Sequence, residues 1–102
     1  MDNFDNVFSQ VINADMPALI MFYKPGDPRC VEEAPRMHQA AKDLEGYAHF
    51  MEVNCETHPE LKARYHIHAY PTFAVFRDGQ ETWRAEGRIP KYEPESMLRR
   101  FR

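Results

Sequence analysis

The segment from Ala18 to Pro35, with the sequence ALIMFYKPGDPRCVEEAP, constrains the fold of this chain more than any other. Its first part, Ala18–Tyr23, is a short apolar run bounded by chain-breaking residues, which is typical of a strand buried on both faces. A Pro-Gly break follows, and Asp27 then precedes Pro28, which is the pattern of a helix cap followed by proline at the first helical position. The segment predicts a buried strand, a sharp turn, and a helix that carries Cys30 in its first turn.

The rest of the chain predicts alternating helices and strands. Apolar periodicity and turn residues predict the order α-β-α-β-α-β-β-α. Two strands joined through a helix should be parallel, and two joined by the Asp78-Gly79 turn should form a hairpin, so the sheet is mixed and covered by helices. The expected helices cover 3–13, 28 to about 46, a short segment opened by a capping box at 57–60, and a last one from Pro94; the other strands cover 48–54, 73–76 and 81–86.

Composition narrows the class of protein. The chain has 102 residues, 43% of them apolar and 28% charged, which predicts one globular domain over 1–102. A net charge of −3 argues against nucleic acid or an acidic membrane as a partner, and the longest apolar run is too short to span a bilayer. With no leader or retention signal in the sequence and only two cysteines, we expect a cytoplasmic protein without a disulfide framework.

Four short motifs occur in order along the chain and share the spacing of one known family. Cys30 through Pro35 matches the stretch from the second active-site cysteine of thioredoxin to its Ala-Pro pair. The other three motifs are Val53–Glu56, Tyr65–Thr72 and Phe76–Gly79. The chain from Phe4 onward therefore resembles the thioredoxin family, and Tyr70-Pro71-Thr72 and Val53-Asn54-Cys55 lean toward its protein disulfide isomerase branch.

The resemblance implies a thioredoxin-like α/β fold with about four strands, lacking the family's N-terminal strand, and a cis peptide before Pro71. It also locates two departures from the family's chemistry. The first active-site cysteine of the family falls on Asp27, which has no sulfur, and the buried acid of the family falls on Met21, which cannot titrate. Dithiol exchange needs an attacking thiolate and a resolving thiol, so the pair of changes predicts a domain that does not perform it.

These departures favour a redox-inactive domain that binds a protein or an extended peptide without a cofactor. The groove implied by the family is lined by Gly26, Pro28, Ala69, Tyr70 and Pro71. The alternative is an enzyme, a monothiol redox protein that uses Cys30. In the purely structural interpretation, Cys30 is a small residue of the core. A third interpretation is that Asp27 replaces a cysteine of an otherwise active disulfide oxidoreductase.

Cys55, the His66-x-His68 pair and Trp83 each have a structural and a functional interpretation. Cys55 is expected to pack in the core, although a Cys30–Cys55 bridge stays open. His66 and His68 alternate as on an extended segment beside Asp27, but His-x-His alone is a weak metal signal and we expect no metal site. Trp83 is expected to be a packing residue.

The last expectation concerns the strand at 49–54. In the family this strand pairs with the N-terminal strand that the chain lacks, so it should form a sheet edge that exposes unpaired backbone groups. We expect this edge either to assemble with another strand or to be covered by the N-terminal segment.

Overall fold

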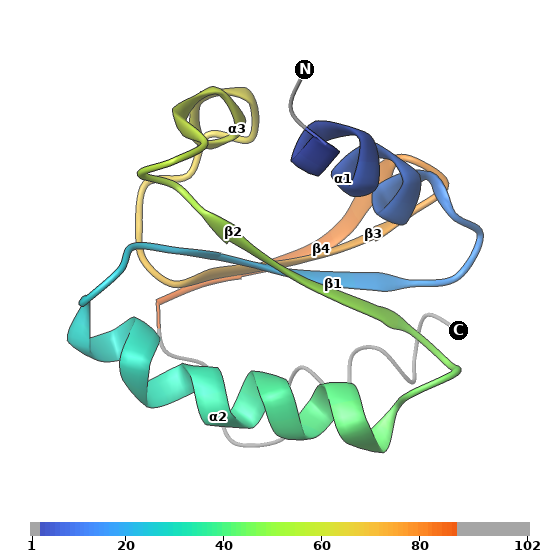
Figure 1. The fold of residues 1–102 in the computed structure, drawn as a ribbon, viewed down its shortest axis with the longest axis horizontal. Helices are drawn as coiled ribbons and strands as arrows, with labels where there is room; N and C mark the ends of the chain where they lie inside the picture. Colours follow the sequence, from blue (N-terminus) through green and yellow to red (C-terminus); the bar gives the residue numbers. More distant parts are fainter. Residues whose placement is uncertain (1–2, 88–102) are drawn as a thin grey trace.

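The computed structural model describes residues 3–87, in which helices cover both faces of a four-stranded mixed sheet (Figure 1). Helix α2 lies on one face, and α1 and α3 lie on the other. The predicted last helix, from Pro94, falls outside the described residues. Within the described part, no helix has the length and apolar character needed to cross a membrane. In chain order the elements are α1 (Asn3–Asn13), β1 (Ala18–Tyr23), α2 (Pro28–Asp43), β2 (His49–Asn54), α3 (Pro59–Arg64), β3 (Thr72–Arg77) and β4 (Gln80–Glu86).

The sheet has the strand order β2-β1-β3-β4. Strands β1 and β2 are parallel, with Met21 opposite Glu52, whereas β3 is antiparallel to both β1 and β4. The predicted parallel pair, the hairpin and the mixed sheet are therefore confirmed. Strand β1 has a neighbour on each edge and helices on each face, which explains why Ala18–Tyr23 is almost uniformly apolar.

The core consists of two clusters separated by the sheet. Successive side chains of a strand point to opposite faces, so β1 sends Ile20 and Phe22 to one cluster and Leu19 and Met21 to the other. The first cluster also contains Phe8 and Ile12 of α1, Leu61 of α3, and Phe76; the second contains Met37 of α2, Leu44, Phe73 and Val75. Trp83 lies opposite Val75 and packs against the second cluster, which agrees with the predicted packing role.

The Asp78-Gly79 turn is confirmed and also holds the first helix. Both residues have positive φ, 52° and 81°, as a two-residue hairpin turn requires. The Asp78 N–H donates to the Ala14 carbonyl at 2.9 Å, and the Gly79 N–H donates to the Ile12 carbonyl at 2.8 Å. A Cβ atom at Gly79 would lie 2.5 Å from Asn13 Oδ1, so the turn approaches the end of α1 closely.

The capping box predicted at Thr57 is wrong. Helix α3 begins at Pro59, so its N-cap is His58, which makes no side-chain cap bond. Proline prefers the first helical position, and this moves the start of the helix one residue past the position that a threonine cap requires. The Thr57 hydroxyl donates instead to the Asn54 carbonyl at 3.2 Å. Helix α2 also ends earlier than predicted, at Asp43 instead of near Gly46, with Leu44 as its C-cap.

Candidate functional site

Asp27 caps helix α2. Its backbone is extended, with φ −66° and ψ 125°, and Pro28 follows at the start of the helix. The Asp27 carboxylate accepts the backbone N–H of Arg29 at 2.9 Å and that of Cys30 at 3.2 Å. Asp27 thus satisfies two N–H groups that a helix start leaves without partners.

Cys30 lies in the first turn of α2 and faces inward, with 4% of its surface exposed. Burial raises the pKa of the Cys30 thiol, and the charge of Asp27 and its side-chain hydrogen bond raise this pKa further. A hydrogen bond from the Lys24 backbone and the charge of Arg29 act in the lowering direction, but the net direction is upward. Since the thiolate is the nucleophilic form, this environment holds Cys30 in its less reactive state at neutral pH.

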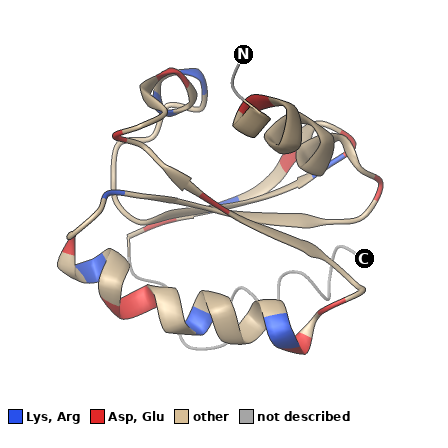
Figure 2. Ribbon diagram, viewed as in Figure 1, with Lys and Arg blue, Asp and Glu red and all other residues tan. Residues whose placement is uncertain are grey.

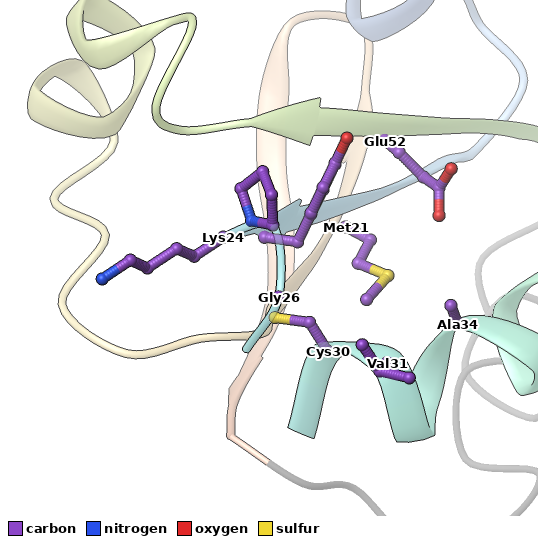
Figure 3. Close-up of a pocket in the computed structure, with 9 residues that line it drawn as sticks. Met21, Lys24, Gly26, Cys30, Val31, Ala34 and Glu52 are labelled. Carbon is purple, nitrogen blue, oxygen red and sulfur yellow. The ribbon is translucent and has the colours of Figure 1, made fainter. Parts of the chain in front are cut away.

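A pocket of about 200 Å³ lies beside Cys30 (Figure 3). The Cys30 sulfur points toward the loop that carries Lys24 and Gly26, whereas the Glu52 carboxylate lies at the other end of the pocket. Glu52 is the partner of Met21 in the parallel register, and its carboxylate lies 3.2 Å from His38 Nε2. The sequence analysis missed this carboxylate, although pairing the two predicted strands in register would have placed it beside Met21.

The Tyr70-Pro71 loop contains the second part of the predicted groove, and its peptide bond is cis. Two of its carbonyl groups are occupied: that of Pro71 accepts the Gly87 N–H at 2.7 Å, and that of Ala69 accepts the Thr72 hydroxyl at 2.6 Å. Between them, neither the N–H nor the C=O of Tyr70 has a hydrogen-bond partner among residues 3–87. With respect to residues 3–87, Tyr70 is therefore a backbone position of this loop at which both groups can pair with another chain.

Three residues that the sequence analysis did not select connect the two parts of the groove. Lys24 lines the pocket beside Cys30 and also a hollow that contains Tyr70. Arg29 Nη1 lies 3.9 Å from the place that a Cβ of Gly87 would occupy, and Gly87 is bonded to Pro71. The start of α2 and the cis-proline loop thus lie at the same end of the sheet.

Cys55 follows β2 and belongs to the core cluster on the α1 and α3 face, whereas Cys30 belongs to the cluster on the α2 face. Both are free thiols, so the structure contains no Cys30–Cys55 bridge. Burial raises the pKa of Cys55 to about 11. The Cys55 N–H donates to the Tyr23 carbonyl at 2.9 Å, which links the ends of β2 and β1. The predicted packing role of Cys55 agrees with this environment.

The histidines of the His-x-His segment do not lie on an extended strand. His66 has a positive φ of 53°, and the two imidazole rings are 6.5 Å apart. They line a hollow with Lys62 of α3, and neither lines the pocket beside Cys30. Among the described residues, the side chains close enough together to share an ion lie elsewhere: Asp5, His58 and Glu60 each have one potential ligand atom within 4.8 Å of the others.

Comparison with known proteins decides the family. The thioredoxin family model matches residues 2–100 of this chain. The chain belongs to the thioredoxin family. Thioredoxin 1 of Nostoc sp. is 32% identical over 88 residues, which cover 85% of this chain and 82% of that protein. A thioredoxin of Porphyra purpurea is 29% identical over 92 residues, covering 90% of this chain and 86% of that protein.

A solved structure shows the same fold. The thioredoxin of Fasciola hepatica superposes with a TM-score of 0.84 at 22% identity, covering 98% of this chain and 92% of that one. The thioredoxin fold and family predicted from the four motifs are therefore confirmed. These relatives are thioredoxins, so they support the family as a whole and not its protein disulfide isomerase branch in particular.

Proposed function

We propose that this thioredoxin-family protein binds an extended segment of a partner protein and does not perform dithiol exchange. The observation that carries the proposal is the place of Asp27. The spacing of the sequence motif aligns Asp27 with the attacking cysteine of the family, and the Asp27 carboxylate accepts hydrogen bonds from the start of α2. A carboxylate does not attack a disulfide to form a mixed disulfide, so the first step of the exchange has no nucleophile at this position.

The remaining thiol does not replace the missing one. Cys30 is nearly inaccessible, and its pKa is raised chiefly by burial and then by Asp27. In the family, a buried acid accepts the proton of the resolving thiol, and the corresponding residue of this chain is Met21, which cannot accept a proton. The Glu52 carboxylate in the same pocket lies at the far end from the sulfur (Figure 3).

Peptide binding does not need either thiol. An extended segment pairs with a chain through backbone hydrogen bonds, and side-chain pockets add specificity. The open N–H and C=O of Tyr70 supply the pairing groups. Val31 offers an apolar surface beside Cys30, since 63% of it is exposed. Gly26 and Pro28 are exposed at the same end of the molecule. A relation to the protein disulfide isomerase branch, indicated by Tyr70-Pro71-Thr72 and Val53-Asn54-Cys55, is part of this proposal.

A monothiol redox protein is the second candidate, and the pocket beside Cys30 favours it. In that reaction the Cys30 thiolate attacks a low-molecular-weight disulfide, forms one mixed disulfide, and releases one thiolate. The interpretation that Asp27 replaces a cysteine of an active oxidoreductase predicts a different result: a cysteine at position 27 should restore disulfide reduction.

Reduction of insulin disulfides by dithiothreitol distinguishes these candidates. We expect wild type and C30A to give the same rate as buffer, and C30A to keep the peptide affinity of wild type. Turnover by wild type that is lost in C30A would overturn the proposal in favour of the monothiol enzyme. The D27C variant tests the third interpretation, because full thioredoxin activity in D27C would indicate that the missing thiol at position 27 is the only feature that keeps this site inactive.

A further inference from the structure

A basic hollow of about 550 Å³ lies at the carboxyl ends of β1 and β2. Because these strands are parallel, their ends meet at the same edge of the sheet, and the bond from Cys55 to Tyr23 holds them together. Lys24 follows β1, and Lys62 comes from α3. Figure 2 shows these basic segments on the same side of the molecule. The hollow, which we call the Lys24–Lys62 pocket, is lined by Lys24, Cys55, Glu56, Pro59, Lys62 and Tyr70.

The charge of this pocket is opposite to that of the chain. Two ammonium groups and one carboxylate line it, whereas the chain has a net charge of −3. The Lys62 charge acts on the Cys55 thiol at the pocket wall, where it partly offsets the effect of burial on the pKa of that thiol. A second hollow, of about 420 Å³, shares Lys62 and Pro59 and adds His66 and His68. Among residues 3–87, no acidic side chain lines this second hollow.

The pocket adjoins the backbone position that is open to pairing. Tyr70 lines the pocket, and its N–H and C=O have no partner within residues 3–87. In an extended segment, successive side chains point to opposite faces. A segment paired with Tyr70 would therefore direct one side chain next to the pairing residue toward the two lysines.

We propose that the Lys24–Lys62 pocket binds an aspartate or glutamate side chain of the extended segment that docks along Tyr70. This inference rests on the proposed peptide-binding function and names the chemistry of the partner. Two lysines in the lining attract a carboxylate, and Glu56 disfavours a second acid at the same place.

The test is selection of cysteine-free random peptides displayed on phage against the wild-type protein. We expect selected peptides to carry Asp or Glu at a fixed place. In fluorescence anisotropy, replacing that acid by its amide should weaken binding by about 1.4-fold to fivefold for each lysine engaged, the range of an exposed ion pair. The loss should shrink at high ionic strength.

Matched variants locate the effect. In K24Q/K62Q, the acidic peptide and its amide should bind alike, and each single variant should lose part of the preference. K42Q removes one lysine charge from α2, as each single variant does from the pocket, and should retain the full preference. Selected peptides without an enriched acid, or a preference that survives in K24Q/K62Q, would overturn the inference and leave peptide binding in place. If no peptide is selected at all, both the inference and the proposed function fail.

Discussion

Asp27 should contribute stability through its cap and lower the reactivity of Cys30 through its charge, and the two effects can be separated. The D27A variant loses both cap bonds, 2.9 Å to Arg29 N–H and 3.2 Å to Cys30 N–H. Loss of a helix cap costs about 1 kcal/mol, so we expect the unfolding midpoint to fall by about 4–8 °C for a domain of this size. D27N keeps a side-chain oxygen at the cap and should lose less.

The thiol should respond differently. Both D27A and D27N remove a negative charge that raises the pKa of Cys30, so both should lower that pKa. Burial, the largest cause, stays in place and keeps the shift partial. The assay is the rate of iodoacetamide alkylation as a function of pH in a C55A background, where Cys30 is the only thiol.

The pattern across the two variants is what tests the reasoning. Stability should separate D27A from D27N, whereas the alkylation profile should group them together against the C55A background alone. A D27A protein as stable as its parent would show that the cap bonds contribute nothing. An unchanged alkylation profile in both variants would show that Asp27 does not act on the thiol.

Three further predictions concern the turn, the second thiol and the sheet edge. Gly79→Ala should destabilise the protein in urea unfolding by more than the about 1–2 kcal/mol that positive φ costs an alanine, because its Cβ would also meet Asn13; in an N13A background the cost should fall to that of φ alone. The pKa of Cys55 rises from 9.0 to about 11 on folding, so the folded state favours the protonated thiol. The stability that this adds is intact below pH 9 and is lost as pH rises through 11, roughly 3 kcal/mol in total. The free energy of unfolding of C55A should therefore depend less on pH over that window, and parallel pH profiles of wild type and C55A would refute this. β2 forms one edge of the sheet, and since the N–H groups of His49 and Cys55 donate to the β1 side, the N–H of Glu52 points outward. If this edge assembles copies of the chain, wild type should be a dimer by light scattering and E52P a folded monomer; a wild type that stays monomeric at high concentration ends that prediction.

The fold was predictable because the local sequence patterns favour the same helices, strands and turns that the sheet requires. The apolar run at Ala18–Tyr23 could be assigned to a central strand since it had no polar position to face water, and the structure buries it between two strands and two layers of helices. Asp78-Gly79 could be assigned to a hairpin since few other residues adopt positive φ so readily. Thr57 was misassigned because two start signals competed one residue apart, and the proline prevailed.

The candidate site was predictable only in part. Asp27, Cys30 and Pro71 follow from spacing along the chain. Glu52, Lys24 and Lys62 are brought to the site by strand pairing and by the packing of α3, which are relations between distant segments. A sequence pattern does not contain those relations until a register is assumed, so the charged lining of both pockets became visible only in the structure.

The hydrogen bonds between the Asp78-Gly79 turn and the end of α1 have a consequence for synthesis of the chain. The Ile12 carbonyl lies in the last turn of α1, where helices leave carbonyls without partners, and its donor is Gly79. During translation, α1 emerges long before the hairpin that completes it. Helix α1 is therefore made before the hairpin but fully hydrogen-bonded only after it. A nascent chain that stalls before the hairpin carries an open helix end and an uncovered apolar face made by Phe8 and Ile12.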